Sequence, residues 1–190
     1  MQQDTRTALL DSAERAVRTR GFDGFSYADL ANDVGIRKAS IHHHFPTKAA
    51  LSVALMKRYH EEFSLALARI DATSSSANLR LAAVIEHYKT ALHGGKTLCL
   101  CVSLSTSLES LPPEVSIQIS QFRAMIIEWL AKVFEDGAKQ DTIRSVQNPS
   151  AEATAMLPLL EGAQLAARAQ QDSGIFDAAV QLLKLRLAGP

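Results

Sequence analysis

The chain has 190 residues, of which 47% are hydrophobic and 21% charged. This composition is ordinary for a globular protein and too apolar for a disordered one. The 20 basic and 20 acidic residues cancel, so that any argument for nucleic-acid binding must be local. We expect two unequal domains, since this length allows one large domain or two small ones.

Targeting and cysteine signals favour a cytoplasmic protein. The first ten residues lack the basic start and apolar run of a signal peptide, and no apolar stretch approaches the roughly 20 residues that span a bilayer. The two cysteines, Cys99 and Cys101, are too few for a disulfide framework or a four-ligand zinc site. We expect no membrane association, no cofactor and no metal.

Apolar residues recur at helical spacing almost throughout the chain, and no segment alternates strictly enough to require a strand. The run LCLCVSL at residues 98–104 could form a short strand, but its surroundings favour a helix. We therefore expect an all-α protein of about nine helices, at residues 5–20, 26–35, 38–44, 48–72, 78–92, 98–110, 113–137, 150–171 and 175–187.

Residues 26–45 combine two short amphipathic helices with a turn. Ser26 is a good N-cap with Asp29 three residues later, close to a capping box. Gly35 can adopt the backbone conformation that turns the chain, and the small Ala31 lets the two helices approach closely. This pattern predicts a helix-turn-helix, whose second helix enters the major groove of DNA.

Local positive charge accompanies this motif. Residues 34–48 contain three basic residues and no acidic one, which suits a phosphate backbone, although alone it could be an ordinary solvated face. Thr47 and Lys48 begin a helix, where backbone N–H groups favour an anion. The residues expected to contact DNA are Ser26, Tyr27, Arg37, Lys38, Ala39, Ser40, His42, His43, His44, Thr47 and Lys48.

The segment from Gly21 to Leu51 resembles the DNA-binding domain of the TetR family of transcriptional regulators. The resemblance rests on a Gly-Phe turn at residues 21–22, on Tyr27–Ala31, Val34–Ile36, Lys38–Ile41 and His43–Lys48, and on Leu51. It implies an all-helical homodimer that binds a palindromic double-stranded operator and releases it when a small-molecule effector binds. Residues 1–50 would be the DNA-binding domain and 51–190 the effector-binding and dimerisation domain of a repressor, not an enzyme.

His42 departs from the family pattern, which usually has a tyrosine whose hydroxyl meets a phosphate at this position. An imidazole can replace that contact, more strongly when it is protonated. We therefore expect phosphate affinity to weaken as pH rises through neutrality. The three consecutive histidines do not predict a metal site, because neighbouring positions on a helix point about 100° apart.

An effector pocket in the C-terminal domain should be apolar with a few polar groups. Effector binding there should shift the helix that begins at Lys48 and so move the recognition helices of the dimer. Each aromatic candidate could instead be plain core packing. The expected pocket residues are Phe63, His87, Tyr88, Phe122, Met125 and Trp129, with Cys99 and Ser103 as a polar or reactive wall.

Cys99 and Cys101 allow another interpretation. Two positions apart on a helix, they point to nearly opposite sides and are poorly placed to form a disulfide. Both could be small core residues, or one could be a thiol sensor of oxidants or electrophiles. Residues 98–111 and 161–168 are loosely similar to a TetR subgroup that includes electrophile-responsive repressors.

Two rival classes of function remain open. One is a cysteine-dependent enzyme, in which His87 or His93 would activate Cys99, although no sequence motif supports it. The other is a helical binding module without DNA affinity. Salt distinguishes the second rival, because a protein that makes several phosphate contacts loses affinity steeply as ionic strength rises.

The last two expected helices contain more small and apolar residues than one buried face needs. Such a pair can meet the same pair of a second protomer in a four-helix interface around a two-fold axis, or it can simply close the monomer core. A dimer would also place two recognition helices about one DNA turn apart. The expected interface residues are Leu157, Leu160, Gln164, Ala167, Ala179, Leu182 and Leu183.

Overall fold

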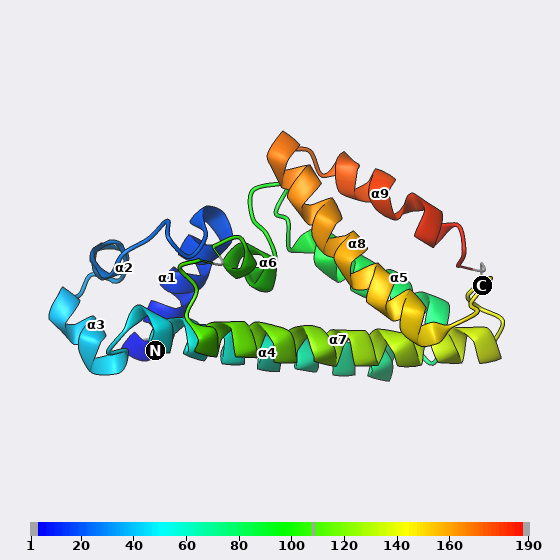
Figure 1. Cartoon of the computed structure of the whole chain (residues 1–190), viewed down its shortest axis with the longest axis horizontal. Coiled ribbons are helices and arrows are strands. Elements are labelled where there is room, and N and C mark those ends of the chain that lie inside the picture. Colours follow the sequence, from blue (N-terminus) through cyan, green and yellow to red (C-terminus); the bar gives the residue numbers. More distant parts are fainter. Residues whose placement is uncertain (1–3, 108, 188–190) are drawn as a thin grey trace. The chain divides into compact units, whose positions relative to one another are not determined.

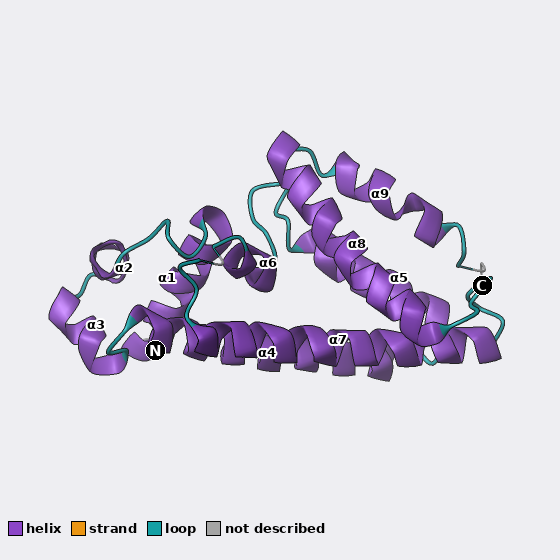
Figure 2. Cartoon of the chain, in the orientation of Figure 1, coloured by secondary structure: helices purple, strands orange, loops and turns teal. Residues whose placement is uncertain are grey.

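The computed structural model describes residues 4–107 and 109–187, and every regular element within them is a helix (Figures 1 and 2). The expected all-α fold is confirmed. The helices of this part of the chain are α1 (Thr5–Arg20), α2 (Tyr27–Val34), α3 (Lys38–His44), α4 (Lys48–Thr73), α5 (Ala77–Thr90), α6 (Leu100–Ser105), α7 (Pro113–Lys139), α8 (Pro149–Gln170) and α9 (Gly174–Lys184).

The helix expected at residues 98–110 is shorter than predicted. Helix α6 covers only Leu100–Ser105, and the described residues that follow form turns, with residue 108 outside the described part. The hydroxyls of Ser105 and Thr106 donate hydrogen bonds of 2.8 Å to the carbonyls of Cys101 and Ser103, respectively. Such side-chain bonds offer the backbone an alternative to the helical ladder. The strand alternative for this run is wrong.

Two compact units divide the chain. The N-terminal unit consists of the described residues of 1–62 and 100–120, and the C-terminal unit of those of 63–99 and 121–190. Helices α4 and α7 therefore contribute to both units. The N-terminal unit is larger than the predicted DNA-binding domain, and the functional boundary at residue 50 stays a prediction.

Helix α1 supplies the core of the N-terminal unit. Its buried stripe matches the predicted one, and Leu9, Ala13 and Val17 are fully buried. This stripe packs against α2 and α6. Burial of a large aliphatic side chain contributes about 1.5–3 kcal/mol, so these contacts hold the small N-terminal unit together.

The connections of α2, α3 and α4 follow the local sequence signals. The Ser26 hydroxyl caps the N–H of Asp29, and the Asp29 carboxylate accepts the N–H of Ser26, which completes the predicted capping box. Gly35 ends α2 with φ of 74°, a left-handed conformation that glycine adopts without strain. Thr47 accepts the Ala50 N–H at 3.0 Å and so caps the start of α4.

In the C-terminal unit α8 packs against α9 and α5 (Figure 1). The core is aromatic as well as aliphatic, and Tyr88, Phe122, Phe134 and Phe176 are at most 1% exposed. Gln164 is a buried polar residue of this core. Its side chain accepts the Cys99 N–H at 3.0 Å and donates to the Tyr88 carbonyl at 2.7 Å, which satisfies its buried polar atoms.

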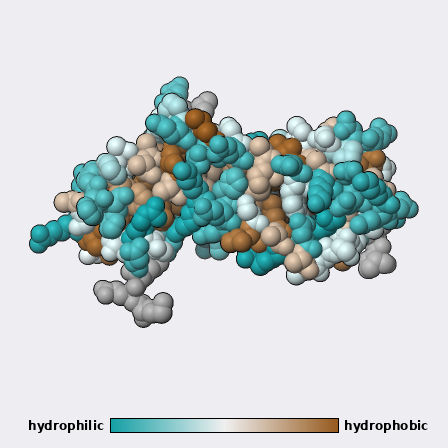
Figure 3. Space-filling model, turned by 90° about the horizontal axis from the view of Figure 1, so that it is seen from below, coloured by the Kyte–Doolittle hydropathy of each residue, from teal (hydrophilic) through white to brown (hydrophobic). Residues whose placement is uncertain are grey.

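The surface is polar over most of its visible area. The face drawn in Figure 3 is largely hydrophilic and carries separate hydrophobic patches. Within the described residues, no helix combines the length and apolar character needed to cross a bilayer.

Candidate functional site

Helix α3 presents a polar face from a rigid support. Ile41 is fully buried and anchors α3, which packs against α2. The side chains on the other faces of α3 and at its start point to solvent: Arg37, Lys38, Ala39, Ser40, His42 and His43 are exposed, and His44 is half-buried. The structure thus brings these predicted residues together on one short helix, with donors that suit phosphates and base edges.

The imidazole of His42 is oriented by two contacts. Its Nδ1 lies 3.2 Å from the Pro46 carbonyl oxygen, and its ring meets the Tyr27 ring edge-on at 5.0 Å. A carbonyl oxygen only accepts, so Nδ1 donates this hydrogen bond. In the neutral ring Nε2 therefore carries a lone pair, and it becomes a donor only when the ring is protonated.

Tyr27 and Ser26 act within the domain. The Tyr27 hydroxyl is buried and donates to the Phe45 carbonyl at 2.9 Å, and burial raises the pKa of Tyr27 to about 12. The Ser26 hydroxyl serves the capping box with Asp29. Both hydroxyls have partners that fix α2 and α3, and the DNA contacts expected from these two residues stay predictions.

Lys48 contacts the connector between α1 and α2. Its ammonium group donates a 2.7 Å hydrogen bond to the Phe25 carbonyl and lies over the rings of Phe22 and Phe25, at 4.6 and 4.1 Å from their centroids. Burial lowers the pKa of Lys48, against the opposing charges of two nearby aspartates. Lys48 therefore links α4 to the connector after α1, and the phosphate contact expected from it stays a prediction. Thr47 is exposed as the helix cap.

Arg6 lies beside the end of α3, and the sequence did not predict it as a site residue. Its exposed guanidinium stacks over the Phe45 ring at 5.2 Å from the centroid, next to the end of α3. The first turn of α1 contains no acidic residue to offset this positive charge. Only the tertiary contact with Phe45 reveals the placement, so sequence periodicity gave no signal for it.

The expected effector residues fall into three places. Phe63 packs edge-on against His87, Tyr88 and Phe122, with centroid distances of 4.7, 5.8 and 5.3 Å, in an aromatic cluster of the C-terminal unit. Met125 and Trp129 line an open groove instead. Cys99 belongs to the C-terminal unit and Ser103 to the N-terminal unit. The single pocket expected from these residues stays a prediction.

The groove measures about 900 Å³ and is formed by α4, α7 and the start of α8. Leu67 and Ala68 contribute from α4, and Pro149 contributes from α8. This volume lies within the range of small-molecule sites in proteins. Of the residues expected in the effector pocket, Met125 and Trp129 line this groove.

Cys99 and Cys101 are both thiols and at most 1% exposed. Cys101 lies in α6, and Cys99 directly precedes it. Their burial agrees with the interpretation as core residues. Buried cysteines are commonly unreactive, which does not favour a thiol sensor. The thiol-sensor alternative stays a prediction.

Most of the expected dimer residues lie on the inner faces of α8 and α9. Leu157, Leu160, Gln164 and Ala167 are fully buried, and Leu183 is 7% exposed, so they close the protomer core. Ala179 is half-buried and Leu182 is 78% exposed. The outer face of these helices carries other apolar or small residues, which we call the α8–α9 outer face: Ala155, Leu159, Gly162, Leu165, Ala166, Ala169, Ala178, Leu182 and Leu185.

The comparisons with known proteins agree with this arrangement. A family pattern described as "Bacterial regulatory proteins, tetR family" matches residues 9–55. The HTH-type transcriptional repressor NemR of Escherichia coli K12 is 25% identical over 194 residues, covering 100% of this chain and 96% of NemR. The HTH-type regulator TtgR of Pseudomonas putida is 39% identical over 59 residues, 31% of this chain and 28% of TtgR.

Solved structures extend the similarity to the whole fold. A TetR-family transcriptional regulator from Agrobacterium tumefaciens superposes with a TM-score of 0.91 at 29% identity, covering 97% of this chain and 98% of that one. A TetR regulator from Legionella pneumophila gives 0.89 at 26% identity, with 98% and 99% covered. The fold and the exposed α3 define a helix-turn-helix DNA-binding protein. Residues 9–55 match the TetR-family pattern, and the described part of the chain shares the fold of TetR-family transcriptional regulators.

Proposed function

We propose that this protein is a homodimeric, ligand-responsive repressor that binds a palindromic double-stranded operator through α3. The observation that carries the proposal is the exposed polar face of α3, held by a buried Ile41. Arg37 and Lys38 supply the positive charge for phosphates, and Ser40 and His43 supply groups for base edges. Arg6 adds a cation beside the same helix.

The α8–α9 outer face supports the homodimer. It contains four of the large hydrophobic side chains that the protomer leaves exposed, Leu159, Leu165, Leu182 and Leu185, together with small residues. Small and apolar residues allow helices of two protomers to approach closely around a two-fold axis. The two-fold axis that relates the protomers also supplies the second recognition helix that a palindromic operator requires.

Two observations support the proposal of repression and of release by a ligand: the similarity to known repressors and the groove in the C-terminal unit. The name of NemR describes a transcriptional repressor, and the match covers both chains almost completely. The groove between α4 and α7 provides space for an effector, and α4 begins at Lys48 beside the DNA-binding helices. Thermodynamic linkage requires that an effector which weakens operator binding is itself bound more weakly when the operator is present.

Selection of bound duplexes from a random DNA pool tests this proposal. We expect an inverted repeat whose half-sites are about 10 base pairs apart, centre to centre, and whose affinity falls steeply with salt. The selected duplex then serves in gel-shift titrations with candidate effectors. A consensus without an inverted repeat would contradict the proposal that the protein binds its operator as a homodimer. Binding that no effector weakens would contradict the ligand response alone.

A further inference from the structure

The groove of the C-terminal unit has an aromatic and apolar wall. Trp129 and Met125 contribute from α7, and Leu67 contributes from α4. Trp129 is the single tryptophan of the chain and is half-buried, so that part of its ring remains accessible. An indole ring binds both flat apolar groups and cations, since the face of its π-system is electronegative.

The charges that line the groove are mostly negative. Three carboxylates, those of Asp71, Glu128 and Glu135, face one ammonium group, that of Lys132. Glu135 forms an ion pair with Lys139 at 2.6 Å, and Asp71 forms one with Arg80 at 3.5 Å. Among the residues that the structure describes, Glu128 has no ion-pair partner within 4.0 Å, so its charge is available to a ligand.

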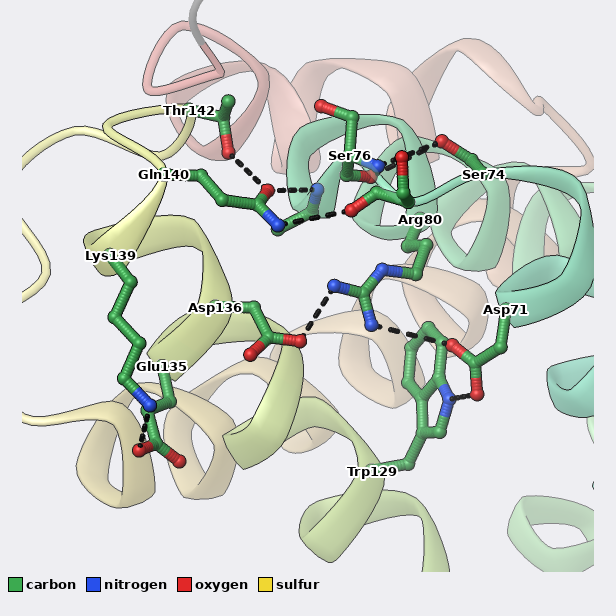
Figure 4. A network of polar contacts seen from close by, with 12 residues as sticks. Asp71, Ser74, Ser76, Arg80, Trp129, Glu135, Asp136, Lys139, Gln140 and Thr142 are labelled. Atoms are coloured by element: carbon green, nitrogen blue, oxygen red, sulfur yellow. Dashed lines mark hydrogen bonds and ion pairs between the residues drawn. The ribbon is translucent and has the colours of Figure 1, made fainter.

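The Asp71 carboxylate and the Trp129 ring are held in place together (Figure 4). The indole N–H donates to Asp71 at 3.0 Å. Arg80, whose side chain is 9% exposed, bridges Asp71 and Asp136, with a 2.7 Å bond to the latter. Because Arg80 is itself fixed between two carboxylates, the aromatic wall and the acidic groups have a preformed geometry, which lowers the entropic cost of binding.

We infer that this groove binds lipophilic organic cations, with an aromatic group on Trp129 and the positive charge near Glu128. The inference rests on the proposed function, for which it names the chemical class of effector. A cation gains attraction from the carboxylates and from the indole face, whereas an anion of equal shape is repelled by the same groups. A neutral molecule gains only the apolar contacts.

Tetraphenylphosphonium and tetraphenylborate test the inference, because they have nearly the same shape and opposite charge. Equilibrium dialysis measures their affinity, and the fluorescence of the single tryptophan shows whether binding occurs at Trp129. We expect the phosphonium ion to bind at least about tenfold more tightly than the borate and to change the fluorescence. Equal affinities, or binding without a fluorescence change, would overturn the inference.

Three variants separate charge from structural damage. Glu128→Gln removes a negative charge from the groove and should weaken phosphonium binding about tenfold. Lys132→Gln removes a positive charge and should tighten phosphonium binding. Glu86→Gln removes an exposed carboxylate of α5 that does not line the groove and should leave affinity unchanged. Weaker binding in both groove variants would indicate damage to the groove and contradict the charge argument.

Operator binding is measured separately on the same proteins without the cation. No phosphonium binding to the original protein, together with intact operator binding, would refute this inference and leave the proposed repressor standing. Phosphonium binding to a protein that selects no inverted repeat would refute the repressor and leave the cation site standing. If the phosphonium ion binds and operator affinity is unchanged, the groove is not the effector site.

Discussion

The ammonium group of Lys48 donates a 2.7 Å hydrogen bond to the carbonyl of Phe25. Lys48 is the first residue of α4, and Phe25 belongs to the connector between α1 and α2. Because the same ammonium lies over two phenylalanine rings, the start of α4 is fastened to the helix-turn-helix. We propose that a displacement of α4 by an effector would also displace the connector and α2. Because α2 packs against α3, the position of α3 would change as well.

Replacement Lys48→Met should destabilise the protein by about 1–2 kcal/mol, because it removes a charged hydrogen bond and two cation–π contacts. Urea unfolding measures this change. The salt dependence of operator binding should keep its slope, because the ammonium already donates to the Phe25 carbonyl. A slope reduced by about one unit would show that Lys48 contacts DNA after all.

Neutralisation of Arg37 or Lys38 should weaken binding to specific and nonspecific DNA alike. Each variant, Arg37→Gln and Lys38→Gln, should lower the slope of log K against log[salt] by about one, since each loses one phosphate contact. Fluorescence anisotropy at several salt concentrations measures the slope. Lys57→Gln, an exposed cation on α4, is the matched control and should behave as the original protein. Similar slopes in all proteins would refute the phosphate contacts.

Operator affinity should fall as pH rises from 6 to 8 at fixed salt, by about tenfold. The Pro46 carbonyl occupies the Nδ1 hydrogen of His42, so only the protonated ring can donate from Nε2 to a phosphate. His42→Tyr should abolish the dependence, whereas His43→Gln should retain it. Equal affinity of the original protein at both pH values would contradict this role.

The capping box should make stability sensitive to acid. The Ser26 hydroxyl and backbone N–H hold the pKa of Asp29 below its usual value of 3.8. A carboxyl with a lowered folded-state pKa stabilises the protein at neutral pH, and this contribution is lost as pH falls through that pKa. Asp29→Asn should therefore be less stable at pH 7, with a difference that shrinks below about pH 4. A constant difference from pH 7 to pH 2.5 in urea unfolding would be incompatible with this explanation.

A charge on the α8–α9 outer face should prevent dimerisation. Leu182 is 78% exposed in the protomer, so Leu182→Glu leaves the core intact but places a charge on the face that we propose as the dimer interface. Sedimentation velocity should show a monomer. Leu65→Glu alters a residue of α4 that is 59% exposed and lies outside this face, and it should remain dimeric. A dimer in both variants would exclude the outer face as the interface.

Local signals predicted the DNA-binding helices well. The capping box at Ser26 and the turn at Gly35 depend on neighbouring residues, and the structure confirms both. The exposed side of α3 also followed from periodicity, because Ile41 is its single buried residue. These features need no knowledge of distant segments.

Features that depend on distant contacts were not predictable in the same way. Helix α8 carries small and apolar residues on all sides, so the sequence did not distinguish the buried Leu157 from the exposed Leu159. The hydrogen bond of the Lys48 ammonium to the Phe25 carbonyl joins residues 23 positions apart, so nothing in the sequence indicated it. Cys99 and Ser103 are close in sequence but belong to different units.

The stoichiometry of the complex with selected DNA tests the central claim most directly. Sedimentation equilibrium with a labelled duplex should show two protomers on an intact inverted repeat. Scrambling one half-site should lower the affinity by at least about a hundredfold. Each mismatched base pair costs about 1–3 kcal/mol, and a scrambled half-site contains several. One protomer bound with equal affinity to both duplexes would contradict a dimeric regulator that reads DNA with two α3 helices.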